Sequence, residues 1–184
     1  MTADPDLIAN FPDFVHLLER DGVFHRTNPA EMTVEIPTQR GSLDSVMLVR
    51  WQPADGVIQF IQVLPLTIGD AQLGSLVDAV TRLNHVLAIP GFDVNHTRKI
   101  LAYRLYLPLQ PRGGVTAVEI QRMFQITVKT AAELLPVLAR VLAGATPPAE
   151  VVADAQREYA ALAAAQGAPT PPSTPQAPPA TGMN

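Results

Sequence analysis

The sequence contains no cysteine, few charged side chains and few aromatic ones. The lack of cysteine excludes disulfide bonds and thiolate metal sites. Charged residues make up 16% of the chain and the formal net charge is -4, so the basic excess that is typical of nucleic-acid-binding domains is missing. No apolar run approaches the roughly 20 residues that a helix needs to span a bilayer, and we expect no membrane partner.

The amino terminus lacks the basic segment of a secretory signal. Its first residues, MTADPDLIANF, are acidic, which is the wrong charge for a signal peptide. We therefore expect a cytoplasmic protein. With 184 residues, of which 47% are apolar, the chain is long enough to bury a substantial core.

The common catalytic and phosphate-binding motifs are missing as well. The sequence has no HExxH, GxSxG, GxGxxG or GxxxxGK[ST] pattern. We expect no enzyme, no cofactor and no bound metal. One alternative stays open: His85 and His96 flank a Pro-Gly break and could approach one another, so an enzyme with a histidine-based site, with or without a metal, is a third hypothesis.

The segment 69–107 organises the chain. Apolar residues first recur at three- and four-residue steps, which predicts an amphipathic helix that Asp70 would cap. Pro90 and Gly91 end this pattern. The period then changes to two, which predicts a β-hairpin whose residue Tyr103 faces the core.

Other elements are predicted on both sides of this segment. Before it, the patterns indicate a helix over 11–20 and three strands, of which the last, 57–66, is apolar on both faces and should lie inside a sheet. After it, Thr116 and Glu119 form a capping box that opens a helix. Pro136 should kink this helix, or split it near Thr130, where a second capping box begins.

The C-terminal part of the chain differs in composition. We expect a domain over 1–144, an alanine-rich helical extension over 145–166, and a disordered tail over 167–184, which has six prolines and no charged side chain. The predicted fold is of the α+β class: a two-layer α/β sandwich with an antiparallel five-stranded sheet. Its elements follow the order α-β-β-β-α-β-β-α, with the C-terminal helix added.

This order, together with particular segments, resembles the YbjN family, whose fold is that of the type III secretion chaperones. The segments are the strand IQFIQVLPL, the helix ending LVDAVTRLNHV, the strand pair around PGFDVNH and ILAYRLYL, and Gly114-Val115 at the start of the last helix. The similar segment runs roughly from Val57 to Gly144, and the full domain match would cover about 7–144. The resemblance implies a dimer that acts by binding proteins, with no catalytic residues to carry over, and it leaves a secretion, stress-response or DNA-repair pathway equally open.

We therefore expect a chaperone-like or regulatory protein-binding module that forms a homodimer and binds an unidentified client protein. The strands and helices offer more apolar surface than a small two-layer domain easily hides, and the exposed remainder would mark an interface. The apolar stripe of the central helix serves either the fold or a partner or dimer interface. Its members are Leu73, Leu76, Val77, Val80 and Leu83.

The alternative hypothesis is direct binding of single-stranded nucleic acid by a basic and aromatic hairpin. The simpler interpretation is that the basic side chains of this hairpin form a solvent-exposed face. The possible contacts are Arg98, Lys99, Arg104 and Arg112.

Overall fold

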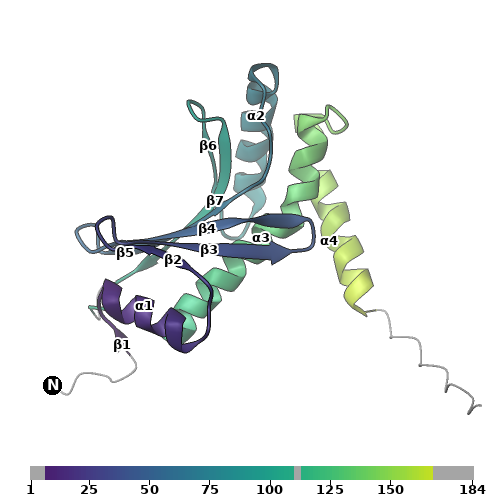
Figure 1. Ribbon diagram of the computed structural model, residues 1–184. Helices are drawn as coiled ribbons and strands as arrows, with labels where there is room; N and C mark the ends of the chain where they lie inside the picture. Colours follow the sequence, from purple (N-terminus) through teal and green to yellow (C-terminus); the bar gives the residue numbers. More distant parts are fainter. Residues whose placement is uncertain (1–6, 110–112, 168–184) are drawn as a thin grey trace, which may run out of the picture.

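A six-stranded antiparallel sheet forms one layer of the computed structural model, which describes residues 7–109 and 113–167 (Figure 1). A separate pair of short strands and four α-helices complete the architecture. The six strands, in spatial order, are β2 (Arg26–Asn28), β3 (Thr33–Arg40), β4 (Leu43–Gln52), β5 (Val57–Val63), β7 (Ile100–Pro108) and β6 (Phe92–Asn95). The separate pair is β1 (Leu7–Ile8) and β8 (Val115–Thr116), and the helices are α1 (Phe11–Arg20), α2 (Asp70–Val86), α3 (Ala117–Leu142) and α4 (Val151–Gly167), with a 3-10 turn, η1 (Pro148–Glu150), before α4.

The predicted α+β class is confirmed, but the predicted number of five strands is wrong. Strands β3, β4 and β5 and the hairpin β6–β7 lie where the alternation of apolar residues placed them. Strands β1, β2 and β8 have only two or three residues each, and all three residues of β2 are exposed. Such strands are defined by their pairing with a neighbour, so they leave no pattern of burial in the sequence.

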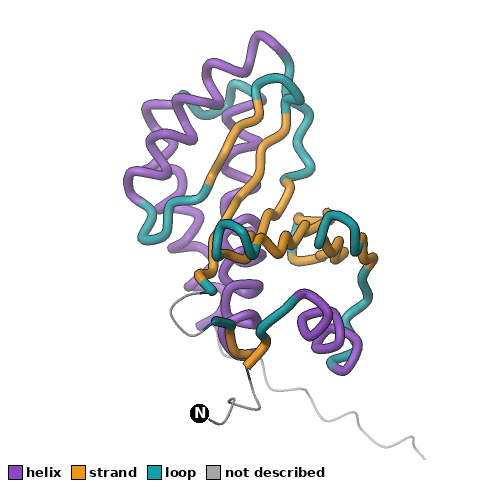
Figure 2. The backbone as a smooth tube through the Cα atoms, turned by 90° about the vertical axis from the view of Figure 1, so that its left-hand side faces the viewer, coloured by secondary structure: helices purple, strands orange, loops and turns teal. Residues whose placement is uncertain are grey.

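The helices cover one face of the sheet, and the other face lies open. In Figure 2 the helices of this layer lie beside and behind the long orange strands. Side chains in register across five strands form a buried row that faces the helices: Ile36, Met47, Gln62, Tyr103 and Phe92. The open face carries Glu35, Leu48 and Arg104, which lie one position along the same strands. No helix among the described residues is long and apolar enough to cross a membrane.

Strand β5 lies inside the sheet, as its continuous apolar run predicted. Its side chains are buried on both faces, including the amide of Gln62, which is fully inaccessible to solvent. The Gln62 Oε1 atom accepts a hydrogen bond of 3.1 Å from the hydroxyl of Thr38. The Gln62 Nε2 atom donates to the carbonyl oxygens of Val46 (3.4 Å) and Val63 (3.2 Å). The buried amide is therefore satisfied.

The first two helices begin with different caps. In α1, the side chain of Asn10 accepts from the backbone N–H of Asp13 at 2.9 Å, and Pro12 sits in the first turn, where its missing N–H costs nothing. In α2, the prediction that Asp70 caps the helix is wrong. The cap is Gly69, whose N–H donates to the side chain of Gln72 at 2.9 Å.

Helix α3 runs unbroken through 26 residues, so the predicted split near Thr130 did not occur. The capping box at its start is confirmed: the hydroxyl of Thr116 accepts from the backbone N–H of Glu119 at 3.2 Å, and the carboxylate of Glu119 accepts from the N–H of Thr116 at 2.8 Å. Pro136 lies within the helix between buried neighbours on both sides. Packing against the sheet thus outweighs the hydrogen bond that proline removes.

Helix α4 packs against α3 and α2, and a partly buried ion-pair cluster joins it to α3. Arg140 of α3 donates to Asp154 at 2.9 Å and to Glu158 at 3.0 Å, and the hydroxyl of Thr146 donates to Asp154 at 2.9 Å. Val151 is fully buried beside them. The alanine-rich extension is therefore part of the packed body. The tail that the sequence predicts to be disordered lies, from residue 168 onward, outside the described residues.

Candidate functional site

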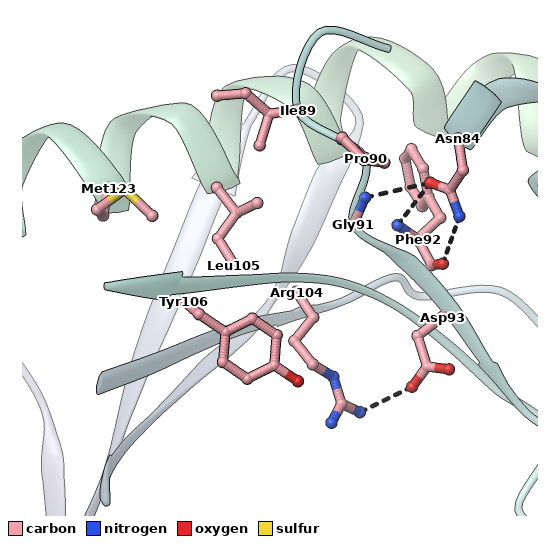
Figure 3. Close-up of a pocket in the computed structure, with 10 residues that line it drawn as sticks. All are labelled: Asn84, Ile89, Pro90, Gly91, Phe92, Asp93, Arg104, Leu105, Tyr106 and Met123. Carbon is pink, nitrogen blue, oxygen red and sulfur yellow. Dashed lines mark hydrogen bonds and ion pairs between the residues drawn. The ribbon is translucent and has the colours of Figure 1, made fainter. Parts of the chain in front are cut away.

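A groove opens where strand β6 ends and leaves the edge of β7 uncovered. The two strands pair from Asn95 and Ile100 up to Phe92 and Tyr103, and the N–H of Arg104 then donates to the carbonyl of Gly91 at 2.8 Å. Beyond this point β7 continues to Pro108 with β5 on one side and, among the described residues, no strand on the other. We call the resulting hollow of about 620 Å³ the edge groove; Figure 3 labels its lining residues.

The edge groove is apolar on one side of β7 and polar on the other. Ile89, Leu105 and Met123 gather on the side of the helices (Figure 3). On the opposite side, Arg104 forms an ion pair of 2.8 Å with Asp93, and Tyr106 is half-exposed. An uncovered strand edge with an apolar side and a charged rim can bind an extended peptide by adding it to the sheet.

The side chain of Asn84 fixes the backbone that borders the groove. Its Oδ1 atom accepts from the N–H groups of Gly91 (3.1 Å) and Phe92 (3.0 Å), and its Nδ2 atom donates to the carbonyl of Phe92 at 2.8 Å (Figure 3). The hydroxyl of Tyr103 adds a bond of 2.7 Å to the carbonyl of Ile89. Burial raises the pKa of this Tyr103 hydroxyl, which keeps it protonated as a donor.

Gly91 lies so close to β7 that a side chain would not fit. A Cβ atom at this position would lie 2.6 Å from the carbonyl oxygen of Arg104 and 2.9 Å from the ring of Tyr103. That ring also packs against Phe92, with 4.8 Å between the ring centroids. The wall of the groove is thus built by one amide, one glycine and two aromatic rings that pack at a tilt.

We expect graded losses of stability when Asn84 is replaced. The variant Asn84→Asp keeps both accepted hydrogen bonds but loses the donor to Phe92, and should lower the free energy of unfolding by about 1 kcal/mol. The variant Asn84→Ala loses all three and should lower it by about 2 kcal/mol. Urea unfolding measures both, and equal values for the two variants would contradict a role for the two accepted bonds.

The structure places the predicted stripe of α2 mainly inside the single chain. Leu76 and Leu83 are fully buried, and Val80 is 5% exposed. Leu73 and Val77 are partly buried. Packing of the fold accounts for the first three side chains, which are not available to a partner on the surface of this chain.

Two members of the predicted basic cluster are paired with carboxylates in the structure. Lys99 pairs with Asp70 at 2.8 Å, and Arg104 pairs with Asp93. Arg98 is exposed in the hairpin turn, while Arg112 lies outside the described residues.

The two histidines of the third hypothesis, His85 and His96, are both exposed. In the described part of the chain, no hydrogen bond or ion pair joins them, and no three His, Asp or Glu side chains gather as a metal site would require.

Sequence reasoning missed the residues that build the edge groove. It identified the break at Pro90 and Gly91 but gave no role to Asn84 or Ile89. The available signal for Asn84 was its place in the last turn of a helix, shortly before the Pro-Gly break, where an amide can bind free backbone groups of the returning chain.

Comparisons with known proteins place the fold. The model of the YbjN family, described as "Putative bacterial sensory transduction regulator", matches residues 16–140. A similar solved structure is "Crystal structure of YbjN, a putative transcription regulator from E. coli", which is 13% identical, has a TM-score of 0.53, and is matched over 70% of this chain and 91% of that chain. At this identity the likeness concerns the fold alone. No curated protein matches the chain.

Proposed function

Since the family model spans residues 16–140, this chain belongs to the YbjN family, and we propose that it is a non-enzymatic regulator that binds a client protein at the edge groove. The description of the family as sensory transduction regulators supports a regulatory role. The observation that carries the proposal is the uncovered edge of β7 beside the apolar side chains of Ile89, Leu105 and Met123.

The proposed mode of binding is strand addition. An extended client segment would pair with the backbone of β7 around Tyr106 and place alternate apolar side chains against Ile89 and Met123. The resemblance to type III secretion chaperones, which implies binding along apolar grooves and strand edges, supports the same mode.

We further propose a homodimer that uses the open face of the sheet. Phe24 is 76% exposed and Val46 is 41% exposed. Together with Pro37 they form the apolar part of a hollow of about 240 Å³ on this face, which Arg26 and Glu35 also line. Exposed apolar surface of this kind is common at interfaces between subunits.

The test of client binding is the variant Ile89→Glu, compared with Val118→Glu as a matched control. Ile89 is 43% exposed in the groove, and Val118 is 72% exposed away from it at the start of α3. When the purified chain is used to capture proteins from a lysate of its source organism, a stoichiometric client should be retained by the wild type and by Val118→Glu. The variant Ile89→Glu should retain about tenfold less, because a charge in the apolar side of the groove is costly to bury.

Two outcomes would contradict these proposals. Equal capture by both variants, or capture that a nuclease abolishes, would exclude the edge groove as the client site. Sedimentation velocity on the same wild-type sample measures its mass, and a monomer would contradict the proposed homodimer.

A further inference from the structure

A second hollow lies next to the edge groove, towards helix α4. It has a volume of about 350 Å³ and lies between the end of α2, the middle of α3 and the side chain of Tyr159. All of its lining residues are uncharged. Val86 and Ile89, at its rim, are 54% and 43% exposed.

The two hollows are neighbours along one face of α3. Ile89 borders both of them. Met123 lines the edge groove, while Ile126 and Thr130 line the second hollow, and their spacing of three and four residues puts all three on one face of the helix. We call the two hollows together, from Tyr106 to Tyr159, the α3 channel.

Helix α4 brings the described end of the chain close to the second hollow. Arg140 near the end of α3 contacts Asp154 near the start of α4, so the two helices run antiparallel. Tyr159 lines the channel, and α4 ends at Gly167, about two turns further on. The last described residue of the chain, Gly167, is therefore about two helical turns from the hollow that Tyr159 lines.

The sequence of this segment matches the uncharged lining of the second hollow and the apolar side of the edge groove. Residues 168–184 contain no charged side chain, and four of their prolines recur at every third position: Pro169, Pro172, Pro175 and Pro178. A polyproline II helix has three residues per turn, so these four prolines would form one face of it, about 28 Å long. The path from Met123 to Thr130 along α3 is only about 10 Å, which leaves ample length to reach the edge groove.

We propose that the proline-rich segment 168–184 binds in the α3 channel of its own chain and thereby competes with the client for the edge groove. Proline-rich segments bind in grooves lined by aromatic and apolar side chains because little conformational entropy is lost. Binding within one chain is favoured further because the segment is tethered at Gly167, close to the channel. The proposed docking of the segment depends only on the α3 channel, whereas the proposed competition with a client also rests on the proposed function.

The absence of cysteine provides a direct test on the full-length chain. A nitroxide spin label on the variant Ser173→Cys reports which backbone amides lie near the segment, through loss of their NMR signals. Residue 173 lies off the proline face. We expect signal loss at residues 86–89 and 126–130 but not at Val118, and the same loss after the label is diluted into an excess of unlabelled protein, as contact within one chain requires.

The prolines outside the face supply a matched control. The double variant Pro172→Ala/Pro175→Ala should abolish the signal loss, while Pro171→Ala/Pro179→Ala should retain it. Signal loss that is absent, uniform over the surface, or equal in the two double variants would overturn the proposal. Transfer of the effect to a second chain in a mixture of spin-labelled and isotope-labelled proteins would overturn binding within one chain.

The two proposals fail in different measurements. If a client is captured through Ile89 but the spin label affects no channel residue, the proposed function stands and the docking of the segment is excluded. If the spin label reduces the signals of channel residues but no client is captured, the docking of the segment is supported and the proposed function is not. If both are observed, Pro172→Ala/Pro175→Ala should raise the amount of client captured, and an unchanged amount would exclude the competition.

Discussion

Replacement of Gly91 by alanine should lower the free energy of unfolding by about 2–3 kcal/mol. The new methyl group would lie 2.6 Å from the backbone oxygen of Arg104 and against the ring of Tyr103. Neither can retreat easily, because the backbone of Arg104 is hydrogen-bonded to Gly91 itself and Tyr103 is 1% exposed. The strain falls on the junction of β6 and β7, so client binding at the edge groove should weaken as well.

The same substitution at Gly74 provides the control. This glycine lies within α2, and a Cβ atom there would meet nothing within 4 Å. The variant Gly74→Ala should raise the free energy of unfolding by about 0.5–1 kcal/mol, because glycine loses more backbone entropy in a helix than alanine does. Urea unfolding at neutral pH measures both variants. Effects of the same sign would contradict the close approach of Gly91 to β7.

Replacement of Asp154 by alanine should release helix α4 and lower the free energy of unfolding by about 3 kcal/mol. Asp154 is 6% exposed and accepts hydrogen bonds from Arg140, Thr146 and Arg157. Without Asp154, the buried hydroxyl of Thr146 loses this acceptor, and Arg140 keeps only its hydrogen bond to Glu158. Hydrogen exchange should therefore accelerate throughout α4 more than in the sheet.

The pH dependence of stability follows from the same carboxylate. Hydrogen bonding and the charge of Arg140 hold the pKa of Asp154 below its usual range in the folded chain. The unfolded chain therefore binds the proton more tightly, and the stabilisation is complete above the unfolded pKa of about 3.9. It is lost as the pH falls from there through the lower pKa of the folded state.

The dependence of stability on pH should differ between the wild type and the variant Asp154→Ala. The difference in unfolding free energy between wild type and Asp154→Ala should be largest near neutral pH and should shrink in acid. Arg157→Ala is the control, because the side chain of Arg157 is 65% exposed and surface ion pairs contribute little. A constant difference between wild type and Asp154→Ala across the pH range would show that the carboxylate charge is not what holds α4.

Much of the fold could be predicted because its main elements have strong local patterns. The capping box at Thr116 marked the start of α3, and the change of period after Pro90 located the β6–β7 hairpin. The apolar run of β5 indicated an interior strand. In each case, neighbouring residues determine the structure, so a single sequence is enough to recognise it.

The edge groove could not be predicted because it depends on differences between elements. It exists because β6 is shorter than β7, which no feature within either strand shows. The function of Asn84 likewise depends on backbone groups seven and eight residues away. The short strand β2 and the packing of the alanine-rich helix α4 depend on neighbours distant in the sequence. Long-range pairing, rather than residue preference, decides these features.

The buried amide of Gln62 has a consequence for the alignment of strand β5 with its neighbours. Sliding a strand by one residue moves every side chain to the other face, and usually exposes its apolar side. In β5, however, both faces are buried and each carries apolar side chains: Ile58, Phe60 and Gln62 face the helices, while Gln59 and Ile61 face the other way. Burial of apolar side chains alone would therefore disfavour only weakly a β5 strand that is shifted by one residue. After such a slip the Gln62 amide would leave its partners on the neighbouring strands, Thr38 and Val46, so this buried polar side chain favours the observed register at the centre of the sheet.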